Sequence, residues 1–142
     1  MKTRANSLDA SVLADFLLGR PQAISLLGQA MSGHEHELIH APELFELEVL
    51  NAMRRLAYGK TISDRQAGMA IEDLASVRIA HHPHAPLRAR IWELRDNLTA
   101  YDAAYLALAE VLDDPVLLTG DDGLASVART SLGSDRVLQM EI

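Results

Sequence analysis

Four acidic side chains of the 142-residue chain have the types and spacing for metal-dependent chemistry on a phosphate ester: Asp9, Glu48, Asp102 and Asp121. Carboxylates that converge on one pocket repel one another, and a pocket of four is strained unless a divalent cation neutralises it. Hard oxygen ligands select Mg²⁺ or Mn²⁺ over zinc. Such an ion lowers the pKa of a bound water and polarises a phosphate oxygen, so the expected chemistry is hydrolysis of a phosphodiester.

Two of these acids follow predicted strands. Asp9 comes directly after a short strand at 5–8, and Asp121 comes one residue beyond an apolar strand at 116–119. In an open α/β sheet, ligands bind at the carboxyl ends of the strands, where the strand order reverses. We therefore expect Asp9 and Asp121 to face the same crevice from neighbouring strands.

The third acid, Asp102, belongs to the first turn of a predicted helix at 99–112, with Thr99 as its N-cap. The helix dipole and the free N–H groups of that turn favour an ionised carboxylate. A purely structural interpretation stays open, because Thr99 and Asp102 can form a capping box. Asp9 and Asp121 can likewise act only as caps of the helices that follow them.

The fourth acid, Glu48, lies in a long helix predicted at 42–58. On a 3.6-residue period it shares a face with Asn51 and Arg55, and it borders the apolar face that should form core. Glu48 can therefore point into a crevice beside the core. Alternatively, it can pair with Arg55 on the surface.

Strands and helices alternate along the chain, which predicts an α/β fold with a mostly parallel sheet covered on both faces. No repeat or long linker divides residues 1–142, and this length suits a single domain. The strand at 5–8 is more polar than a central parallel strand usually is, so we expect it to be very short. The remaining predicted helices lie at 11–19, 21–31, 63–76, 83–96 and after Asp121, and the remaining strands at 37–41, 77–81 and 136–140.

The composition excludes several classes of function. The chain has no cysteine, which excludes disulfides and zinc–thiolate sites and suits the cytoplasm. No apolar run approaches the roughly 20 residues that cross a bilayer, so no membrane association is expected. The net charge of −7, from 13 basic and 20 acidic residues, argues against binding nucleic acid through charge alone. The aromatic content of 4% argues against a base-stacking platform.

The four acids stand in segments that match the motifs of a known family in order. These segments are LDASVLADFLLG with Asp9, APELFELEVLNAMRR with Glu48, ELRDNLTAYDAAYLALAE with Asp102 and LLTGDDGLA with Asp121. They resemble the acidic motifs of the PIN domain, as found in the VapC toxins of toxin–antitoxin pairs, and the resemblance covers nearly the whole chain. The resemblance implies a three-layer α/β/α PIN-like fold with a central parallel sheet.

The resemblance also implies an activity and its partners. PIN domains of this kind are metal-dependent endoribonucleases, and VapC toxins cut structured cellular RNAs and are held inactive by a cognate VapB-type antitoxin. We expect Asp9 and Asp102 to be the main ligands of Mg²⁺, or of Mn²⁺ in its place. Glu48 and Asp121 would hold the metal through water or orient the nucleophile. The candidate hydroxyls that orient these acids are Ser11 and Thr119.

The two long helices predicted at 42–58 and 63–76 carry more apolar residues than one buried face needs. The surplus includes Leu44, Leu47, Leu50, Met69 and Ile71. One face can pack on the sheet, so the surplus favours a protein partner, and the resemblance points to a homodimer as well as to the antitoxin. The alternative is that both helices are buried on two sides.

An acidic protein that cuts RNA needs local cations. The candidate phosphate contacts are Arg54, Arg55, Arg88, Arg90 and Arg95. Arg54 and Arg55 can alternatively serve only to complement the dipole at a helix end. Trp92 is expected to pack against the protein rather than to stack on bases.

Six histidines fall into two groups, His34, His36 and His40, and then His81, His82 and His84. A His-x-His pair invites a transition-metal interpretation. Both groups are predicted in turns or at strand ends without a third type of ligand, so we expect solvated loop residues.

Two other interpretations compete with the nuclease. A catalytically silent PIN-like module would bind RNA or protein, and a metal-dependent cleavage assay separates it from an enzyme. A phosphorylated receiver domain also has an acidic pocket, but it needs an acidic pair after its first strand and a late lysine. Here the pair Asp121-Asp122 comes late and the last lysine is Lys60, so the receiver is discounted.

Overall fold

The sheet extends to both sides of its first strand, β1 (Ala5–Leu8), in the order β3-β2-β1-β4-β5. The computed structural model describes residues 4–31 and 38–141. All the strand pairs within them are parallel. The other strands are β2 (Ile39–Pro42), β3 (Ile79–His82), β4 (Pro115–Thr119) and β5 (Val137–Gln139). The strand order reverses at β1, so the crevice at the carboxyl ends of β1 and β4 is the expected ligand position.

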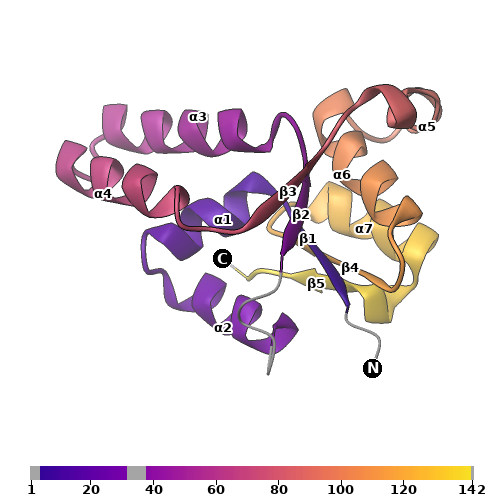
Figure 1. Ribbon diagram of the computed structural model, residues 1–142, viewed down its shortest axis with the longest axis horizontal. Helices are drawn as coiled ribbons and strands as arrows, with labels where there is room; N and C mark the ends of the chain where they lie inside the picture. Colours follow the sequence, from indigo (N-terminus) through magenta and orange to yellow (C-terminus); the bar gives the residue numbers. More distant parts are fainter. Residues whose placement is uncertain (1–3, 32–37, 142) are drawn as a thin grey trace.

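Helices cover both faces of the sheet, which confirms the predicted three-layer α/β/α fold (Figure 1). One layer contains α1 (Ala10–Leu17), α2 (Pro21–Ala30), α3 (Phe45–Tyr58) and α4 (Asp64–Leu74). The other contains α5 (Arg88–Glu93), α6 (Ala100–Val111) and α7 (Asp122–Leu132). None of the helices in the described part of the chain is long and apolar enough to cross a lipid bilayer.

The helix α6 is the central helix of its layer. Its residues from Ala103 to Ala109 are all buried, as expected for a helix that is apolar on every side. The Thr99 side chain caps it by accepting from the Asp102 N–H at 3.2 Å. The cap and the composition together place Asp102 in the first turn, where the sequence predicts it.

Several predicted boundaries differ from the structure. The helix predicted at 83–96 is a 3₁₀ turn (Ala85–Leu87) followed by the short α5. The helix α3 begins at Phe45 rather than at Pro42, because Pro42 is the last residue of β2 and pairs with His82 of β3. The strand predicted at 37–41 starts at residue 37, which lies outside the described residues. The structure shows this strand from Ile39.

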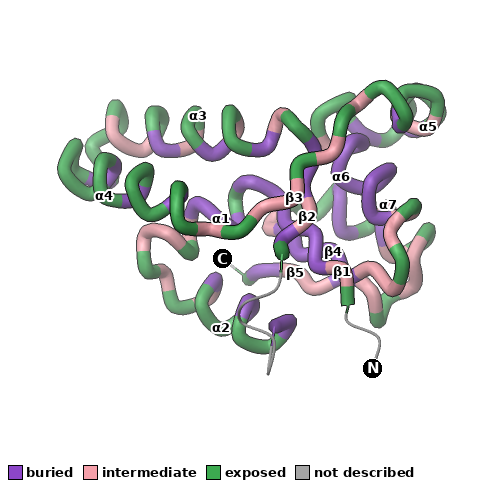
Figure 2. The backbone as a smooth tube through the Cα atoms, viewed as in Figure 1, coloured by how far each residue is buried: buried purple, intermediate pink, exposed green. Residues whose placement is uncertain are grey.

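The helices α3 and α4 run side by side and extend away from the sheet (Figures 1 and 2). Their inner faces meet in a small core of their own around Met53, Ile62 and Ala70. Their outer surfaces expose large apolar side chains: Leu47, Leu50, Met69 and Ile71. The alternative, in which both helices are buried on two sides, is therefore wrong, and apolar side chains of both helices face outward.

The polar residues of β1 lie in the middle of the sheet. Asn6 and Ser7 are fully buried, because β2 and β4 pair with β1 on both sides and helices cover it above and below. Within residues 4–31 and 38–141, Asn6 Oδ1 and Ser7 Oγ have no hydrogen-bond partner. A buried polar atom without a partner costs about 1–3 kcal/mol, so this strand lowers the stability of the fold.

Replacing Ser7 by alanine is expected to stabilise the protein. The change removes the unpaired hydroxyl and leaves the Cβ and the backbone pairing of β1 in place, so the free energy of unfolding should rise by about 1 kcal/mol. Urea unfolding measures it, as a higher midpoint with an unchanged slope. A lower midpoint for Ser7→Ala would show that the hydroxyl makes a stabilising contact.

Candidate active site

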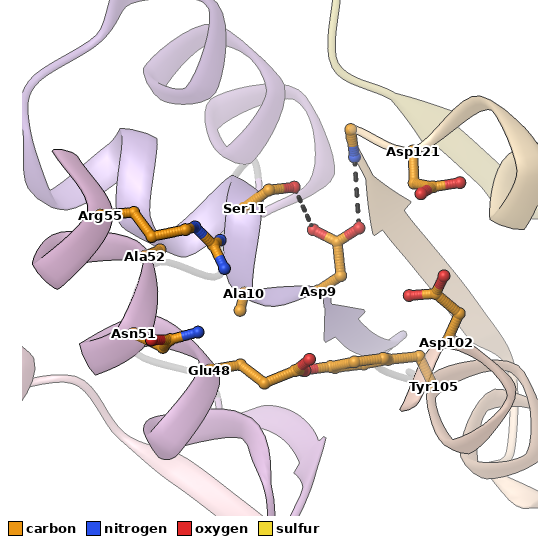
Figure 3. Close-up of a pocket in the computed structure, with 11 residues that line it drawn as sticks. Asp9, Ala10, Ser11, Glu48, Asn51, Ala52, Arg55, Asp102, Tyr105 and Asp121 are labelled. Atoms are coloured by element: carbon orange, nitrogen blue, oxygen red, sulfur yellow. Dashed lines mark hydrogen bonds between the residues drawn. The ribbon is translucent and has the colours of Figure 1, made fainter. Parts of the chain in front are cut away.

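The four predicted acids line one cavity of about 300 Å³ at the carboxyl ends of β1 and β4 (Figure 3). Asp9 directly follows β1, and Asp121 comes two residues after the end of β4. Glu48 reaches the cavity from α3 and Asp102 from α6. The structure therefore brings all four side chains together from four separate segments of the chain.

Asp9 is held by four hydrogen bonds and is 7% exposed. Its Oδ1 accepts from the Ser11 hydroxyl at 2.7 Å and from the Val12 N–H at 3.2 Å, which makes Asp9 the N-cap of α1. Its Oδ2 accepts from the Thr119 hydroxyl and from the Gly120 N–H at 3.3 Å. Asp9 is therefore both the cap of α1 and an acid of the cavity. The two hydroxyls predicted to orient the acids, those of Ser11 and Thr119, both contact it.

The contact between Gly120 and Asp9 depends on the absence of a side chain at position 120. A Cβ there would lie 2.9 Å from the Ser11 Oγ and 3.1 Å from the Met140 Cε. The backbone therefore approaches Asp9 closely enough to donate its N–H only because residue 120 is glycine.

Asp121 is the N-cap of α7 and also lines the cavity. Its Oδ1 accepts from the Leu124 N–H at 2.8 Å, and its own N–H donates to the Thr119 hydroxyl oxygen at 3.0 Å. The Thr119 hydroxyl thereby links two of the acids, since it also donates to Asp9. The neighbouring Asp122 is exposed, accepts from the Gln139 side chain and does not line this cavity.

The pKa of Asp102 shows that the acids repel one another. Burial raises this pKa first, and the negative charges of Asp121, Asp9 and Glu48 raise it further. A hydrogen bond with Thr99 opposes these effects without cancelling them. The carboxylates are therefore close enough for each charge to destabilise the next, as predicted for an acidic cluster.

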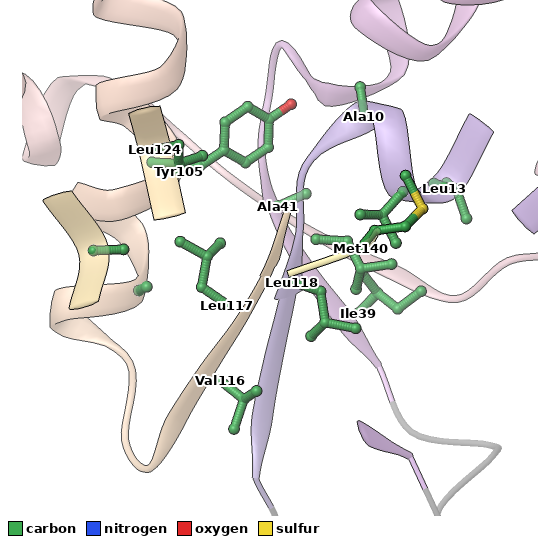
Figure 4. Close-up of a cluster of buried hydrophobic side chains, with 14 of the residues drawn as sticks. Ala10, Leu13, Ile39, Ala41, Tyr105, Val116, Leu117, Leu118, Leu124 and Met140 are labelled. Carbon is green, nitrogen blue, oxygen red and sulfur yellow. The ribbon is translucent and has the colours of Figure 1, made fainter. Parts of the chain in front are cut away.

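Tyr105 lines the same cavity, and sequence reasoning missed it. Its hydroxyl donates to Glu48 Oε1 at 2.5 Å. Its ring is buried in the core (Figure 4) and lies edge-on to the ring of Phe45. Burial and the hydrogen bond to Glu48 raise the pKa of the Tyr105 hydroxyl, which stays protonated and donating. The available signal was its position three residues after Asp102, on the same helix face.

Asn51 and Arg55 line the cavity beside Glu48, as the helix period predicts. Among the described residues no ion pair joins Glu48 to Arg55, so the predicted surface pair is not formed. Arg55 instead places a guanidinium at the rim of the acidic cavity (Figure 3). Arg55 is the basic side chain among the described residues that line this cavity.

The other predicted phosphate contacts have different surroundings. Arg90 is not available, because it donates to Glu110 at 2.7 and 2.9 Å and to Glu93 at 3.1 Å. Arg54 stacks on the Tyr58 ring with its Cζ 4.8 Å from the ring centroid. The remaining two, Arg88 and Arg95, line a second cavity next to α5.

His40 of the first group and His82 and His84 of the second are not solvated loop residues. His40 and His82 lie on neighbouring strands, with Nδ1 of one 3.0 Å from Nε2 of the other, and His84 accepts from the Leu44 N–H. Burial, and then the charge of His82, lower the pKa of His40. His34 and His36 lie outside the described residues.

No three histidine, aspartate or glutamate side chains of residues 4–31 and 38–141 are arranged to hold one metal ion together. The site chemistry suits a hard cation that keeps part of its water shell. Mg²⁺ usually binds proteins through one or two carboxylates and retains several waters. Repelling carboxylates with open oxygens beside a guanidinium can bind such a cation and a phosphate together.

The chain matches the family model described as PIN domain over residues 7–130. It is 38% identical over 120 residues to Ribonuclease VapC1 of Mycobacterium tuberculosis, which covers 84% of this chain and 87% of the relative. It is 35% identical over 118 residues to Ribonuclease VapC12 of the same organism, covering 83% and 88% of the two chains. The crystal structure of PAE2754 from Pyrobaculum aerophilum matches the fold with a TM-score of 0.63 at 24% identity, over 87% of this chain and 78% of that one.

Replacing Asp102 by asparagine is expected to stabilise the metal-free protein at neutral pH. The pKa of Asp102 is raised in the folded state, so its ionised form opposes folding once the pH exceeds that pKa. In EDTA at pH 7–8, Asp102→Asn should raise Tm by roughly 1–3 °C after allowance for solvent screening. The gain should shrink as the pH falls toward about 3, below the ordinary aspartate pKa, where the carboxyl is protonated in both the folded and the unfolded state.

The matched control is Asp64→Asn, which changes an exposed aspartate in the first turn of α4, away from the cavity. Asp64→Asn also removes a negative charge from the first turn of a helix, but it relieves no repulsion between carboxylates, so its Tm should not rise. A gain of equal size in both variants, or no gain for Asp102→Asn, would show that the acids do not repel one another in solution.

Proposed function

The chain belongs to the PIN domain family as a VapC-type member, and from this premise we propose that it is a metal-dependent endoribonuclease. The proposed reaction is hydrolysis of RNA phosphodiester bonds, and the proposed place of action is the cytoplasm. The observation that carries the proposal is the single cavity that receives all four acids from four segments. The relatives named as ribonucleases support RNA as the substrate.

The proposed cofactor is Mg²⁺, with Mn²⁺ as a substitute. The fit rests on the charges, because burial and then three other carboxylates raise the pKa of Asp102, and a divalent cation would relieve the repulsion among these carboxylates. Asp9 and Asp102 are the proposed direct ligands, and Glu48 and Asp121 the proposed ligands through water. When bound, the ion would supply an activated water and polarise a phosphate oxygen.

The protein's own residues position these groups. The hydroxyls of Ser11 and Thr119 each donate to Asp9 and fix the direction of its carboxylate. The Tyr105 hydroxyl does the same for Glu48. Arg55 at the rim is placed to bind a phosphate oxygen of the RNA as it enters the acidic cavity.

The proposed partners are a cognate VapB-type antitoxin and a second copy of the chain. The support is the apolar outer surface of α3 and α4, on which Leu47 is 71% and Met69 56% exposed. An apolar surface of this kind is typical of a protein interface. The likeness to VapC proteins supports an antitoxin as one of the partners.

Replacing Asp9 by asparagine is expected to reduce RNA cleavage by about 100-fold or more. The change keeps the size of the side chain and removes the charge that would bind the ion. The assay is a time course on bulk cellular RNA with antitoxin-free protein, with growth arrest on induced expression as a second readout. Cleavage by the parent should stop in EDTA and return with Mg²⁺ or Mn²⁺, and Ca²⁺ should support little reaction.

The control is Asp122→Asn, which removes an acid adjacent to the site but outside the cavity, and which should cleave as the parent does. In thermal melts Mg²⁺ should raise the Tm of the parent and not that of Asp9→Asn. If Asp9→Asn cleaves RNA and arrests growth like the parent, the nuclease assignment is wrong. A silent PIN-like binding module then replaces it.

Light scattering tests the proposed partners. The protein at tens of micromolar should have the mass of a dimer, and co-expression with the neighbouring gene should yield a complex with a small protein.

The double change of Leu47→Glu and Met69→Glu should disrupt assembly, because it places charges on the apolar surface. Val111→Glu, an exposed apolar site on α6, is the control. A monomer with no co-purifying protein would contradict both partners.

A further inference from the structure

A second cavity, of about 490 Å³, lies beside the acidic one, between α5 and the start of α6. Its apolar floor includes Ile91 and Leu98. Its polar walls are Arg88, Arg95 and the N-cap residue Thr99, with the ring of Trp92 beside them. We call these six residues the Trp92 groove.

Trp92 does not pack inside the protein, which corrects the prediction from the sequence. Its side chain is 67% exposed, although a tryptophan ring gains more from burial than most other side chains. The ring is nevertheless held in place, because the Arg95 Cζ lies 4.5 Å from the ring centroid and Arg95 Nη1 donates to the Trp92 carbonyl at 2.9 Å. A fixed, exposed aromatic ring next to a guanidinium is a stacking surface.

The groove is positively charged in a chain whose net charge is −7. Arg88 and Arg95 are exposed, and in the described part of the chain neither forms an ion pair with a carboxylate. Arg90, between them in sequence, is by contrast neutralised by Glu110 and Glu93. The charge of the groove is therefore complementary to an anion.

The groove and the acidic cavity both adjoin the first turn of α6. Thr99 and Ala100 line the groove, and Asp102, which lies two residues or about 3 Å along the helix axis from Ala100, lines the acidic cavity. A smaller hollow past Ala100 is lined by Tyr101, which is 65% exposed. The two cavities thus adjoin the same N-terminal turn of α6, with the acids on one side and the aromatic rings on the other.

We propose that the Trp92 groove binds an unpaired nucleotide of the RNA that flanks the scissile phosphate. A base stacks on the Trp92–Arg95 pair, and Arg88 contacts the adjacent backbone phosphate. This inference rests on the proposed ribonuclease function and adds a preference for single-stranded RNA next to the cut. Aromatic stacking with arginine–phosphate contacts is how proteins bind single strands, whereas a paired base offers no free face.

Trp92 is the only tryptophan in the chain, so its fluorescence reports on the groove directly. Single-stranded RNA of about ten nucleotides, such as oligouridylate or oligoadenylate, is titrated into the Asp9→Asn protein at low salt, and a duplex of equal length is titrated in parallel. The single strand should quench the emission saturably, and the duplex should bind more weakly and quench less. Raising the salt should weaken binding, because phosphate contacts release counterions.

Variants in the same background are compared by the anisotropy of a labelled RNA strand. Trp92→Ala should weaken binding about tenfold or more, and Trp92→Phe, which keeps a ring, should recover much of the loss. Arg88→Gln and Arg95→Gln should each weaken binding and lower its salt dependence. The matched control is Tyr58→Ala, which removes an exposed ring that also carries a stacked arginine, Arg54, at the far end of α3.

The outcomes separate this inference from the proposed function. If Trp92→Ala binds RNA as its Asp9→Asn background does, and the single variant Trp92→Ala cleaves RNA like the parent, the groove is not a nucleotide subsite and the nuclease assignment stands. If Trp92 emission shifts with protein concentration in the absence of RNA and not on adding RNA, the groove is a contact between copies and the inference is wrong. Equal losses in Tyr58→Ala and Trp92→Ala would also overturn it.

Discussion

The position of the Asp9 carboxylate is the constraint on which the site depends. Its two oxygens accept from donors on both central strand ends: Ser11 and Val12 after β1, and Thr119 and Gly120 at β4. A buried charge requires such partners, and here they also lock β1 against β4 at the edge where the strand order reverses. The acid therefore joins the two halves of the sheet and occupies a single orientation in the cavity. The lack of a side chain at position 120 is a geometric condition for this arrangement.

Repulsion among the other acids lowers the stability of the fold. Asp102 is half-buried in the field of three carboxylates, and its pKa is raised as a result. Each of its neighbours is fixed by one or more hydrogen bonds, such as that from the Tyr105 hydroxyl to Glu48 and that from the Leu124 N–H to Asp121. The repulsion is thus retained while the side chains remain ordered, as expected where a protein gives up stability for a binding site.

The positive charges, like the negative ones, lie at particular places in the structure. An overall charge of −7 repels RNA at long range, so affinity has to come from cations at defined places. Arg55 lines the acidic cavity, and Arg88 and Arg95 line the Trp92 groove. Arg90 serves the fold instead, by tying α5 to Glu110 of α6. A ligand guided only by these local cations would be positioned as well as attracted.

The sequence by itself determined the alternation of strands and helices, the parallel sheet and the four acids, because each follows from local signals. Strand ends, the Thr99 cap and the helix period placed these acids without knowledge of the fold. The tertiary structure decided the features that depend on residues far apart in the chain. Side-chain hydrogen bonds join Tyr105 to Glu48, Arg90 to Glu110 and His40 to His82, and these partners are 57, 20 and 42 positions apart in the sequence. The exposure of Trp92, a residue of α5, also depends on the tertiary structure. The periodicity of α5 alone cannot show which of its faces α6 will cover.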